Sequence, residues 1–298
     1  MQASTGDPRN GKPRIGIIGG SGLYDMPGLK ILQEVRVATA WGAPSDALVY
    51  ADVDGVPVVF LPRHGRGHRV LPSEVNSRAN IAALKLAGVE QVIAFSAVGS
   101  LKESLEPLDF VVPAQLIDRT RQRASTYFGG GVVGHVAFAD PFCHRLADLV
   151  HHGVIDLGLP GGQRGETLVV MEGPLFSTRA ESQLYRSWGA GLINMSTLPE
   201  AKLAREAEIC YCVVCMVTDY DCWKASEADV DIQMVLENLR QNADNARRLV
   251  LRVVAQVARA PRQCACADAC RYAIVTSPEH RNPEAVRRLR TLLPRYFE

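Results

Sequence analysis

The 298-residue sequence has almost no net charge and no long apolar run. Its 33 basic and 32 acidic residues give a formal net charge of +1, so no broad positive field is available for nucleic acid or an anionic membrane surface. There is no run of about eighteen or more apolar residues that would form a membrane-spanning helix. Residues 1–12 lack the apolar middle of a signal peptide, so we expect residues 1–13 to be a solvated tail on a cytoplasmic protein.

Two common phosphate-binding fingerprints are also missing. Residues 14–23 (RIGIIGGSGL) are a β-rich run leading into a glycine-rich turn, in which backbone N–H groups can surround an anion. The dinucleotide pattern G-x-G-x-x-G does not fit, because its third glycine would fall on Asp25, and no Gly-Lys-Ser or Gly-Lys-Thr of a P-loop is present. The turn therefore either binds an anion through Ser21 and its amides or is a plain β-turn.

The cysteines do not indicate an exported, disulfide-bonded protein, because the chain is long and shows no export signal. Five of the eight lie in or beside apolar segments and are most simply small buried side chains: Cys143, Cys210, Cys212, Cys215 and Cys222. In a strand, Cys210 and Cys212 face one way and Cys215 the other, which argues against a metal site built from these three. For the cysteines of residues 264–270 (CACADAC), a disulfide, a redox pair and coincidence stay open.

Strand-like and helix-like segments alternate along the chain without an internal repeat. Strands are expected at residues 47–50, 56–61, 89–98, 110–117, 167–171, 191–195 and 209–218, and helices at residues 76–87, 141–153, 178–188, 201–208, 230–255 and 283–293. Asp54-Gly55 between the first two strands predicts a β-hairpin. The composition does not change before about residue 258. We therefore predict one α/β domain with a largely internal sheet over residues 14–258, followed by a C-terminal extension at residues 259–298.

The strand at residues 209–218 ends in two carboxylates, Asp219 and Asp221. Its uncharged, Val- and Cys-rich sequence is typical of a strand buried on both faces, and such strands end at the ligand side of an open α/β sheet. Side chains alternate along an extended segment, so both acids can point toward one ligand. The alternatives are that they cap a following helix or are solvated at the strand end.

Polar residues follow several other expected strands. Residues 62–69 (PRHGRGHR) form a glycine-spaced cationic loop, which is either a phosphate site or a solvated basic loop. Hydroxyl groups occur at two further strand ends, at Ser96 and at Ser196. The glycine-rich connection at residues 119–140 contains His135, and long loops in compact domains are usually functional or lie at an interface.

Six ordered motifs together resemble one enzyme family: IGIIGGSGL, PRHGRGH, FSAVGS, MEGPLFSTRAES, INMSTLPEA and VTDYDCW. They are similar to those of the 5′-methylthioadenosine phosphorylases, trimeric members of the purine nucleoside phosphorylase family, over residues 14–257. The resemblance implies a nucleoside phosphorylase fold with a twisted, mostly internal mixed sheet flanked by helices. It also implies a homotrimer or a multiple of it, and phosphorolysis of 5′-methylthioadenosine to adenine and 5-methylthioribose 1-phosphate in purine and methionine salvage. Inorganic phosphate would be a co-substrate, with no metal or organic cofactor.

The resemblance also assigns roles to individual residues. Matching motif positions would place around the phosphate Ser21, Arg63, His64, Ser96, Ala97 through its backbone N–H, and Ser196. Asp219 would share a proton with purine N7 and Asp221 would accept from the 6-amino group, which makes these two and Ser196 the expected catalytic residues. The other implied substrate contacts are Met195 on the ribose, Phe176 along the base, Ile232 and Val235 against the methylthio group, and His135 from a neighbouring subunit. For Ile232 and Val235, ordinary core packing is the alternative.

The sequence departs from the family pattern in a few places. Ser21, Ser96 and Ser196 stand where relatives often have threonine, which keeps each hydroxyl, and Leu175 stands where relatives carry arginine. The tail resembles those of prokaryotic relatives in which a C-x-C pair, here Cys264 and Cys266, can form a disulfide, although a reducing cytoplasm disfavours it. The competing functions are phosphorolysis of 5′-methylthioinosine or other 6-oxopurine nucleosides, and nucleotide binding without turnover.

Overall fold

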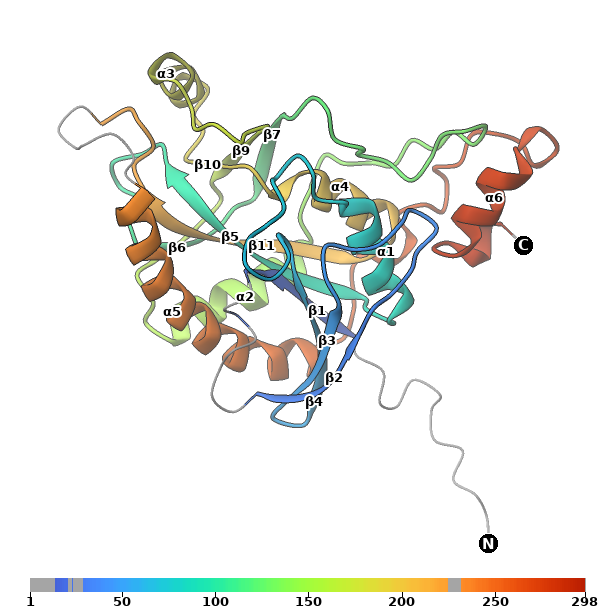
Figure 1. The fold of residues 1–298 in the computed structure, drawn as a ribbon, viewed down its shortest axis with the longest axis horizontal. Helices are drawn as coiled ribbons and strands as arrows, with labels where there is room; N and C mark the ends of the chain where they lie inside the picture. The colour runs from blue at the N-terminus through green and yellow to red at the C-terminus, as the bar shows by residue number, and fades with distance from the viewer. Residues whose placement is uncertain (1–13, 21–22, 24–28, 225–231, 298) are drawn as a thin grey trace, which may run out of the picture.

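Among the residues that the structure describes, eleven strands form one mixed sheet at the centre of the molecule, with six α-helices around it (Figure 1). The computed structural model describes residues 14–20, 23, 29–224 and 232–297, with the side chains of residues 232–236 outside the description. The strands are β1 (Ile15–Gly19), β2 (Lys30–Val35), β3 (Leu48–Val53), β4 (Val56–Pro62), β5 (Gln91–Ser100), β6 (Phe110–Val112), β7 (Gln115–Arg119), β8 (Gly161–Arg164), β9 (Thr167–Met171), β10 (Leu192–Asn194) and β11 (Cys210–Asp219). The helices are α1 (Ser77–Leu86), α2 (His144–Asp156), α3 (Arg179–Ser187), α4 (Thr197–Glu206), α5 (Ile232–Arg259) and α6 (Pro283–Arg290).

The order of the strands brings four parallel strand ends to one edge of the sheet. The main path is β2-β3-β4-β1-β5-β10-β9-β7, and β11 pairs with β5 and β6. The pairs β1–β4, β1–β5 and β5–β11 are all parallel. The carboxyl ends of β1, β4, β5 and β11 therefore point the same way, as they do at the ligand side of open α/β sheets. All ten residues of β11 are buried, which confirms the prediction of a strand covered on both faces.

Local signals in the sequence account for most of the predicted elements. The hairpin of β3 and β4 turns at Asp54 (φ 49°) and Gly55 (φ 83°), the positive values that a tight two-residue turn requires. Helix α1 begins after Asn76, whose side chain accepts from the N–H of Ala79. Helix α3 begins with a reciprocal capping box between Thr178 and Glu181.

One predicted strand is wrong, and two strands were missed. Residues 110–117 form two strands, β6 and β7, because the chain breaks at Pro113, which has no N–H to donate to a ladder. β6 pairs with β11 and β8, whereas β7 pairs with β9. The missed strands are β2 and β8. Neither sequence alternates between apolar and polar residues, so neither shows an apolar face opposite a polar one.

Helices cover both faces of the sheet and one of its ends. Helices α1 and α4 pack on one face, in a core that also contains Cys215. Helices α2 and α5 pack on the other face with Cys210 and Cys212, so the predicted alternation of these cysteines is confirmed. Helix α3 covers the β9–β10 end through Tyr185.

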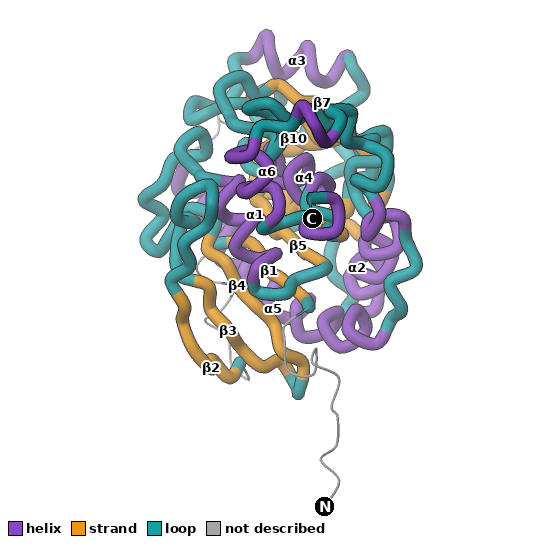
Figure 2. The backbone as a smooth tube through the Cα atoms, turned by 90° about the vertical axis from the view of Figure 1, so that its right-hand side faces the viewer, coloured by secondary structure: helices purple, strands orange, loops and turns teal. Residues whose placement is uncertain are grey.

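The C-terminal tail, residues 260–297, returns to the main core. Figure 2 shows α6 in front of α1 and α4, and the buried Leu289, Leu293 and Phe297 belong to the same apolar cluster as those two helices. Arg295 forms an ion pair of 2.7 Å with the buried Glu208. Within the described residues, no helix combines the length and apolar character needed to cross a membrane.

Candidate active site

The segments that carry the predicted site residues meet at the carboxyl edge of the parallel strands. The N–H of Arg63 donates to the carbonyl of Gly19 at 2.9 Å, which joins the ends of β4 and β1. Gly99 of β5 is paired with Asp219 of β11 on one side and with Ile193 of β10 on the other. Residues far apart in sequence are thereby fixed at one edge by backbone pairing.

Two of the predicted hydroxyl groups are in direct contact. Ser96 Oγ lies 2.8 Å from Ser196 Oγ, although 100 residues separate them. Asn194 Nδ2 donates to Ser96 Oγ at 2.9 Å and to Thr197 Oγ1 at 2.8 Å. Ser196 is the N-cap residue of α4, but its side chain makes no capping hydrogen bond. Its hydroxyl is thus directed to the Ser96 side.

Arg63 is held by a buried ion pair that the sequence analysis did not identify. Its Nε and Nη2 donate to the carboxylate of Glu200 at 2.5 and 3.1 Å, and its Nη1 donates to the carbonyl of Phe95 at 2.8 Å. Tyr211 adds a hydroxyl donor to Glu200 at 2.9 Å. Arg63 is 4% exposed and Glu200 0%. The guanidinium is therefore fixed beside β5, and the carboxylate of Glu200 compensates its charge. Each of its two Nη atoms keeps one N–H that can donate to a ligand.

His64 is neutral near pH 7 in this environment. Burial, followed by the positive charge of Arg63, lowers the pKa of its imidazole from 6.5 to about 4. Its Nδ1 lies 2.9 Å from the carbonyl oxygen of Val70, which can only accept, so Nδ1 carries the proton. Nε2 is then a free acceptor, suited to a hydroxyl group such as the P–OH of monohydrogen phosphate.

The lowered pKa of His64 predicts a specific loss of stability in acid. Between pH 6.5 and 4 the unfolded chain binds a proton at this histidine that the folded chain does not. The contribution of neutral His64 to the free energy of unfolding is therefore fully present above pH 6.5 and is lost as the pH falls toward 4. His64→Asn keeps a donor for Val70 but cannot titrate. Its melting temperature should fall less steeply than that of the wild type between pH 6.5 and 4. The control is His280→Asn, at a side chain that is 77% exposed, and equal slopes for wild type and His64→Asn would contradict the prediction.

Asp219 and Asp221 lie together in a buried turn at the end of β11. They are 7% and 8% exposed, and Asp219 Oδ1 accepts from the backbone N–H of Asp221 at 2.8 Å. Asp219 Oδ2 accepts from the hydroxyl of Thr218 at 2.7 Å. Burial is the largest influence on both side chains and raises the pKa of each, and the charge of Asp221 raises the pKa of Asp219 further. Both carboxyl groups therefore hold protons more readily than exposed acids do.

Asp221 offers a buried acceptor, Oδ2, that receives no well-formed hydrogen bond from the described residues. Burial raises the pKa of its carboxyl group, and the nearby hydroxyls of Ser182 and Ser177 offset part of that rise. An acceptor with so little compensation is costly unless a ligand completes it. Its backbone has φ 51°, a left-handed conformation that Asp and Asn tolerate better than most residues. A Cβ added to Gly99 would lie 3.0 Å from Asp219 Oδ1 and 3.4 Å from the Cβ of Asp221. The missing side chain at Gly99 thus makes room for both acids.

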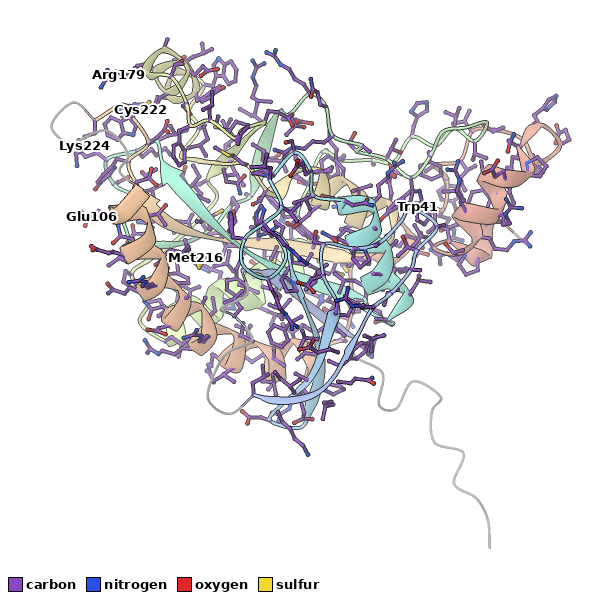
Figure 3. All side chains as sticks on the ribbon, in the orientation of Figure 1. Trp41, Glu106, Arg179, Met216, Cys222 and Lys224 are labelled. Atoms are coloured by element: carbon purple, nitrogen blue, oxygen red, sulfur yellow. The ribbon has the colours of Figure 1, made fainter. Side chains whose placement is uncertain are left out.

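The segment after the carboxylates is anchored to α3. The indole N–H of Trp223 donates to the carbonyl of Ser100 at 2.8 Å, and the guanidinium of Arg186 lies 3.4 Å from the Trp223 ring centroid. Cys222 Sγ donates to the carbonyl of Ser177. In Figure 3, Cys222 and Lys224 lie toward the α3 end of the molecule, whereas Trp41 lies on the other side beside α1.

Met195 directly follows β10, and Phe176 precedes α3. Met195 is partly buried, and its Sδ would lie 2.4 Å from a Cβ added to Gly173 (φ 71°), so glycine is required there. Phe176 is 50% exposed and Leu175 81% exposed in the loop before α3. Ala97 follows Ser96 in β5 and is partly buried.

Four predicted site residues are not placed at the strand ends. Ser21 lies outside the described residues, and Ile232 and Val235 belong to α5 with side chains outside the description. His135 lies in the long connection between β7 and α2, where its N–H donates to the carbonyl of Ala273 in the tail at 2.8 Å. This part of the connection runs along the tail, where Gly134 also pairs with Ile274, and the side chain of His135 is exposed there.

Arg123 is a second residue that the sequence analysis missed. It comes from the long connection, yet its guanidinium donates to the carbonyls of Met195 and Leu198 at 2.5 and 2.6 Å. It also pairs with Glu172 at 3.1 Å and donates to that residue's carbonyl. Arg123 thus fixes the turn that presents Met195 and Ser196. A cavity of about 370 Å³ next to it is bounded by Trp41, residues 73–78, residues 122–124 and Pro199.

Known proteins share this arrangement over most of the chain. Residues 14–255 match the family model of the phosphorylase superfamily. The chain is 51% identical over 283 residues to the S-methyl-5′-thioadenosine phosphorylase of Koribacter versatilis, covering 95% of this chain and 96% of the relative. The crystal structure of a methylthioadenosine phosphorylase from an antarctic soil metagenomic library superposes with a TM-score of 0.90 at 47% identity, covering 95% and 99% of the two chains. The Schistosoma mansoni methylthioadenosine phosphorylase in complex with adenine gives a TM-score of 0.82 at 36% identity, with 91% and 99% covered.

Proposed function

Because this chain belongs to the methylthioadenosine phosphorylases of the phosphorylase superfamily, we propose that it cleaves 5′-methylthioadenosine with inorganic phosphate. The products are adenine and 5-methylthioribose 1-phosphate. The observation that carries this conclusion is the buried carboxylate pair at the end of β11, beside the Ser96–Ser196 hydroxyl pair. Ser96 and Gly99, which contacts the carboxylates, are three residues apart on β5, about 10 Å at the usual rise of a strand. This separation leaves room for a ribose between the phosphate and the base.

The chemistry follows from what each group can do. A phosphate oxygen attacks the ribose C1′ and forms the new C–O bond, while the C1′–N9 bond breaks and its electron pair moves into the purine. Protonated Asp219 donates to N7, which neutralises the departing base and leaves a carboxylate. Arg63, Ser21, Ser96, Ser196 and the N–H of Ala97 hold the phosphate, and His64 Nε2 accepts its P–OH. In the oxocarbenium-like transition state, the phosphate held by these groups thus stabilises the positive charge on the ribose, and Asp219 neutralises the negative charge on the purine.

The remaining contacts set the substrate. Met195 packs on the ribose and Phe176 along the base. Asp221 Oδ2 accepts from the 6-amino group, for which a buried acceptor is suited. A phosphorylase of 5′-methylthioinosine is the second candidate, because the raised pKa of Asp221 would let a protonated carboxyl donate to O6 instead.

One assay tests the activity and its base preference together. Purified protein is incubated with methylthioadenosine, methylthioinosine or inosine, with and without inorganic phosphate, and release of the free base is followed by chromatography. Rapid phosphate-dependent release of adenine from methylthioadenosine is expected. Inosine as the best substrate would overturn the assignment of Asp221, and ligand binding without release of any base would favour a protein that has lost turnover.

Replacing Asp221 by asparagine should shift the preference toward 6-oxopurines. Asparagine tolerates the φ of 51°, and its amide N–H₂ can donate to O6, whereas the negative acceptor for the 6-amino group is lost. We expect the ratio of kcat/KM for methylthioadenosine over methylthioinosine to fall about 10- to 100-fold, the value of one hydrogen bond to a charged group. An unchanged ratio in a variant with wild-type melting temperature would place the 6-substituent elsewhere.

We further propose a cytoplasmic homotrimer, or a multiple of it, acting in purine and methionine salvage without a cofactor in the reaction. All eight cysteines lie among the described residues and are free thiols, which suits a reducing compartment. The backbone of His135 pairs with the tail of its own chain, and a neighbouring subunit's copy would complete the methylthio pocket. Light scattering should give a multiple of three times the chain mass of 32.5 kDa, and a monomer would contradict the proposal.

A further inference from the structure

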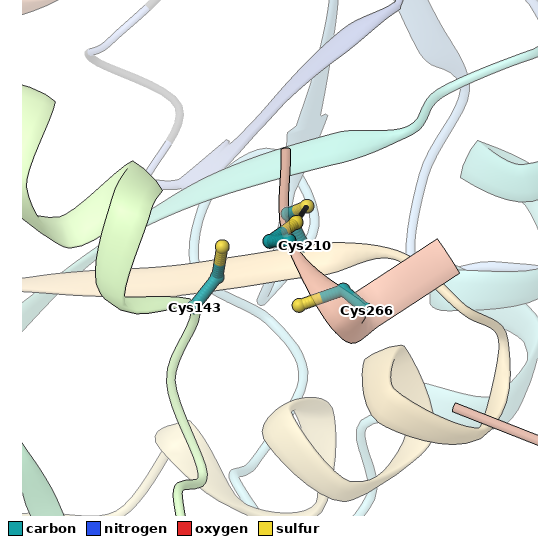
Figure 4. A group of neighbouring side chains, drawn as sticks. Cys143, Cys210 and Cys266 are labelled. Atoms are coloured by element: carbon teal, nitrogen blue, oxygen red, sulfur yellow. Dashed lines mark hydrogen bonds between the residues drawn. The ribbon is translucent and has the colours of Figure 1, made fainter. Parts of the chain in front are cut away.

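Four cysteine sulfur atoms converge at the end of the sheet opposite the active site. Cys143 precedes α2, Cys210 is the first residue of β11, and Cys264 and Cys266 belong to the tail. The four Sγ atoms all lie within 4.8 Å of one another. Figure 4 shows the side chains of Cys143, Cys210 and Cys266 close to one another. We refer to these four residues as the thiol cluster.

The backbone fixes these cysteines in place. The N–H of Cys143 donates to the carbonyl of Tyr211 at 2.8 Å, which ties the start of α2 to β11. Cys264 is extended (φ −151°, ψ 157°) and is followed by a 3₁₀ turn at Ala265–Asp268. This change of direction lets two cysteines separated by one residue reach the same point, a tighter spacing than the two to four residues usual between zinc ligands.

Two arginine side chains lie beside the thiol cluster. Arg262 Nε lies 3.3 Å from Cys210 Sγ, and Arg205 Nη1 lies 4.0 Å from Cys266 Sγ. Cys143, Cys210 and Cys266 are 3%, 0% and 6% exposed. Two guanidinium groups directed at buried sulfur atoms provide the outer donors that a thiolate metal site requires.

We propose that Cys143, Cys210, Cys264 and Cys266 bind a zinc ion as four thiolates in a tetrahedral site. With Zn–S bonds of about 2.3 Å, the sulfur atoms of such a site are about 3.8 Å apart, within the observed limit of 4.8 Å. Binding releases the protons of the four thiols to solvent and leaves a net charge of −2, which Arg262 and Arg205 partly offset.

A metal ion accounts for the cluster better than a disulfide does. A disulfide joins two sulfur atoms at about 2.05 Å, whereas the Cys210–Cys264 separation is 3.3 Å. Four soft sulfur donors in a closed tetrahedral set favour zinc or an iron–sulfur centre over oxygen-preferring metals. Four ligand atoms around one point, all within 4.8 Å of one another, favour a single zinc ion.

The zinc ion would have a structural role. Cys210 and Asp219 are the first and last residues of β11, about 30 Å apart at the rise of a strand, so the metal cannot touch the substrate. It would instead join the tail to β11 and to the start of α2. Metal binding at such a site contributes to folding stability, because the unfolded chain does not preform it.

Metal analysis of the whole protein tests the proposal. The full chain is purified under reducing conditions from zinc-supplemented cells, and zinc is measured by plasma mass spectrometry. About one zinc per chain is expected for the wild type, and a large loss for Cys264→Ser and Cys266→Ser. Cys270→Ser is the matched control, because Cys270 lies in the same tail and is buried but outside the cluster. It should retain the full zinc content.

Three further measurements keep the test decisive even if a variant folds poorly. X-ray absorption of the wild type should show sulfur-only coordination at about 2.3 Å. Stripping with a chelator should lower the melting temperature, and added zinc should restore it. Native thiol counting by mass spectrometry distinguishes the alternative: wild-type protein free of zinc, or with two or four of these cysteines oxidised to disulfides as isolated, would overturn the proposal.

Discussion

Asp219→Asn is expected to lower kcat for methylthioadenosine by about 10²- to 10⁴-fold, the usual contribution of a positioned general acid. The amide can still accept from the N–H of Asp221 through its oxygen, and Thr218 can turn its hydroxyl to the carbonyl of Val98, 3.2 Å away. The fold should therefore survive. Because Asp219 does not contact phosphate in the proposed site, KM for phosphate should change little.

The control for this variant is Asp109→Asn. Asp109 is also buried, at 8% exposure, and burial likewise raises its pKa, but its carboxylate only accepts from the N–H of Glu106. Activity near that of the wild type is expected. The wild-type rate should also decline as the pH rises through the raised pKa of Asp219, a limb that Asp219→Asn should lack. A folded Asp219→Asn protein with kcat within about threefold of wild type would remove Asp219 from the reaction.

Glu200→Ala is expected to lower the free energy of unfolding by about 3–5 kcal/mol, because it leaves the buried Arg63 guanidinium without its counter-ion. Arg63 would keep the carbonyl of Phe95 as its acceptor, and Tyr211 would lose the partner of its hydroxyl. In a chain of this length the melting temperature should fall by roughly 10 °C. KM for phosphate should rise as well, since Arg63 is no longer held in place.

A surface ion pair provides the comparison for Glu200. Asp156 pairs with Arg252 at 2.5 Å, but the two side chains are 40% and 46% exposed, so solvent screens the pair. Asp156→Ala should leave the melting temperature within about 2 °C of wild type. Thermal unfolding and a phosphate titration of both variants decide the question. If Glu200→Ala melted like Asp156→Ala, the buried pair would not position Arg63.

The sequence was sufficient for the elements whose signals are local. The uncharged run of β11 predicts burial, the Asp54-Gly55 turn predicts its hairpin, and Asn76 predicts the start of α1. The carboxylate pair could be predicted because its two members lie on one strand end. β2 was missed because an exposed edge strand has no apolar face to create a period of two.

Partners that are distant in sequence could not be predicted in the same way. Glu200 follows a proline at the start of a helix and has the sequence character of a solvated acid, while Arg63, its partner, is 137 residues away. Arg123 lies in a loop without a motif. The cysteines show the same difficulty, because the set tested from the sequence lay on one strand, whereas the cluster draws on Cys143, Cys210 and the tail. Such groupings depend on the topology of the sheet.

The parallel ladder between β11 and β5 also determines where the turn with Asp219 lies at the end of β11. It runs without interruption from the Cys210–Gln91 pair to the Val217–Val98 pair and then shifts register just before Asp219. A slip of one residue along this ladder would move the terminal acid by about 3.3 Å and exchange the two faces of the strand. The turn carrying Asp219 is thus aligned by hydrogen bonds along the whole length of β11. Mutations far along that strand can therefore misplace the proposed proton donor without any contact with substrate.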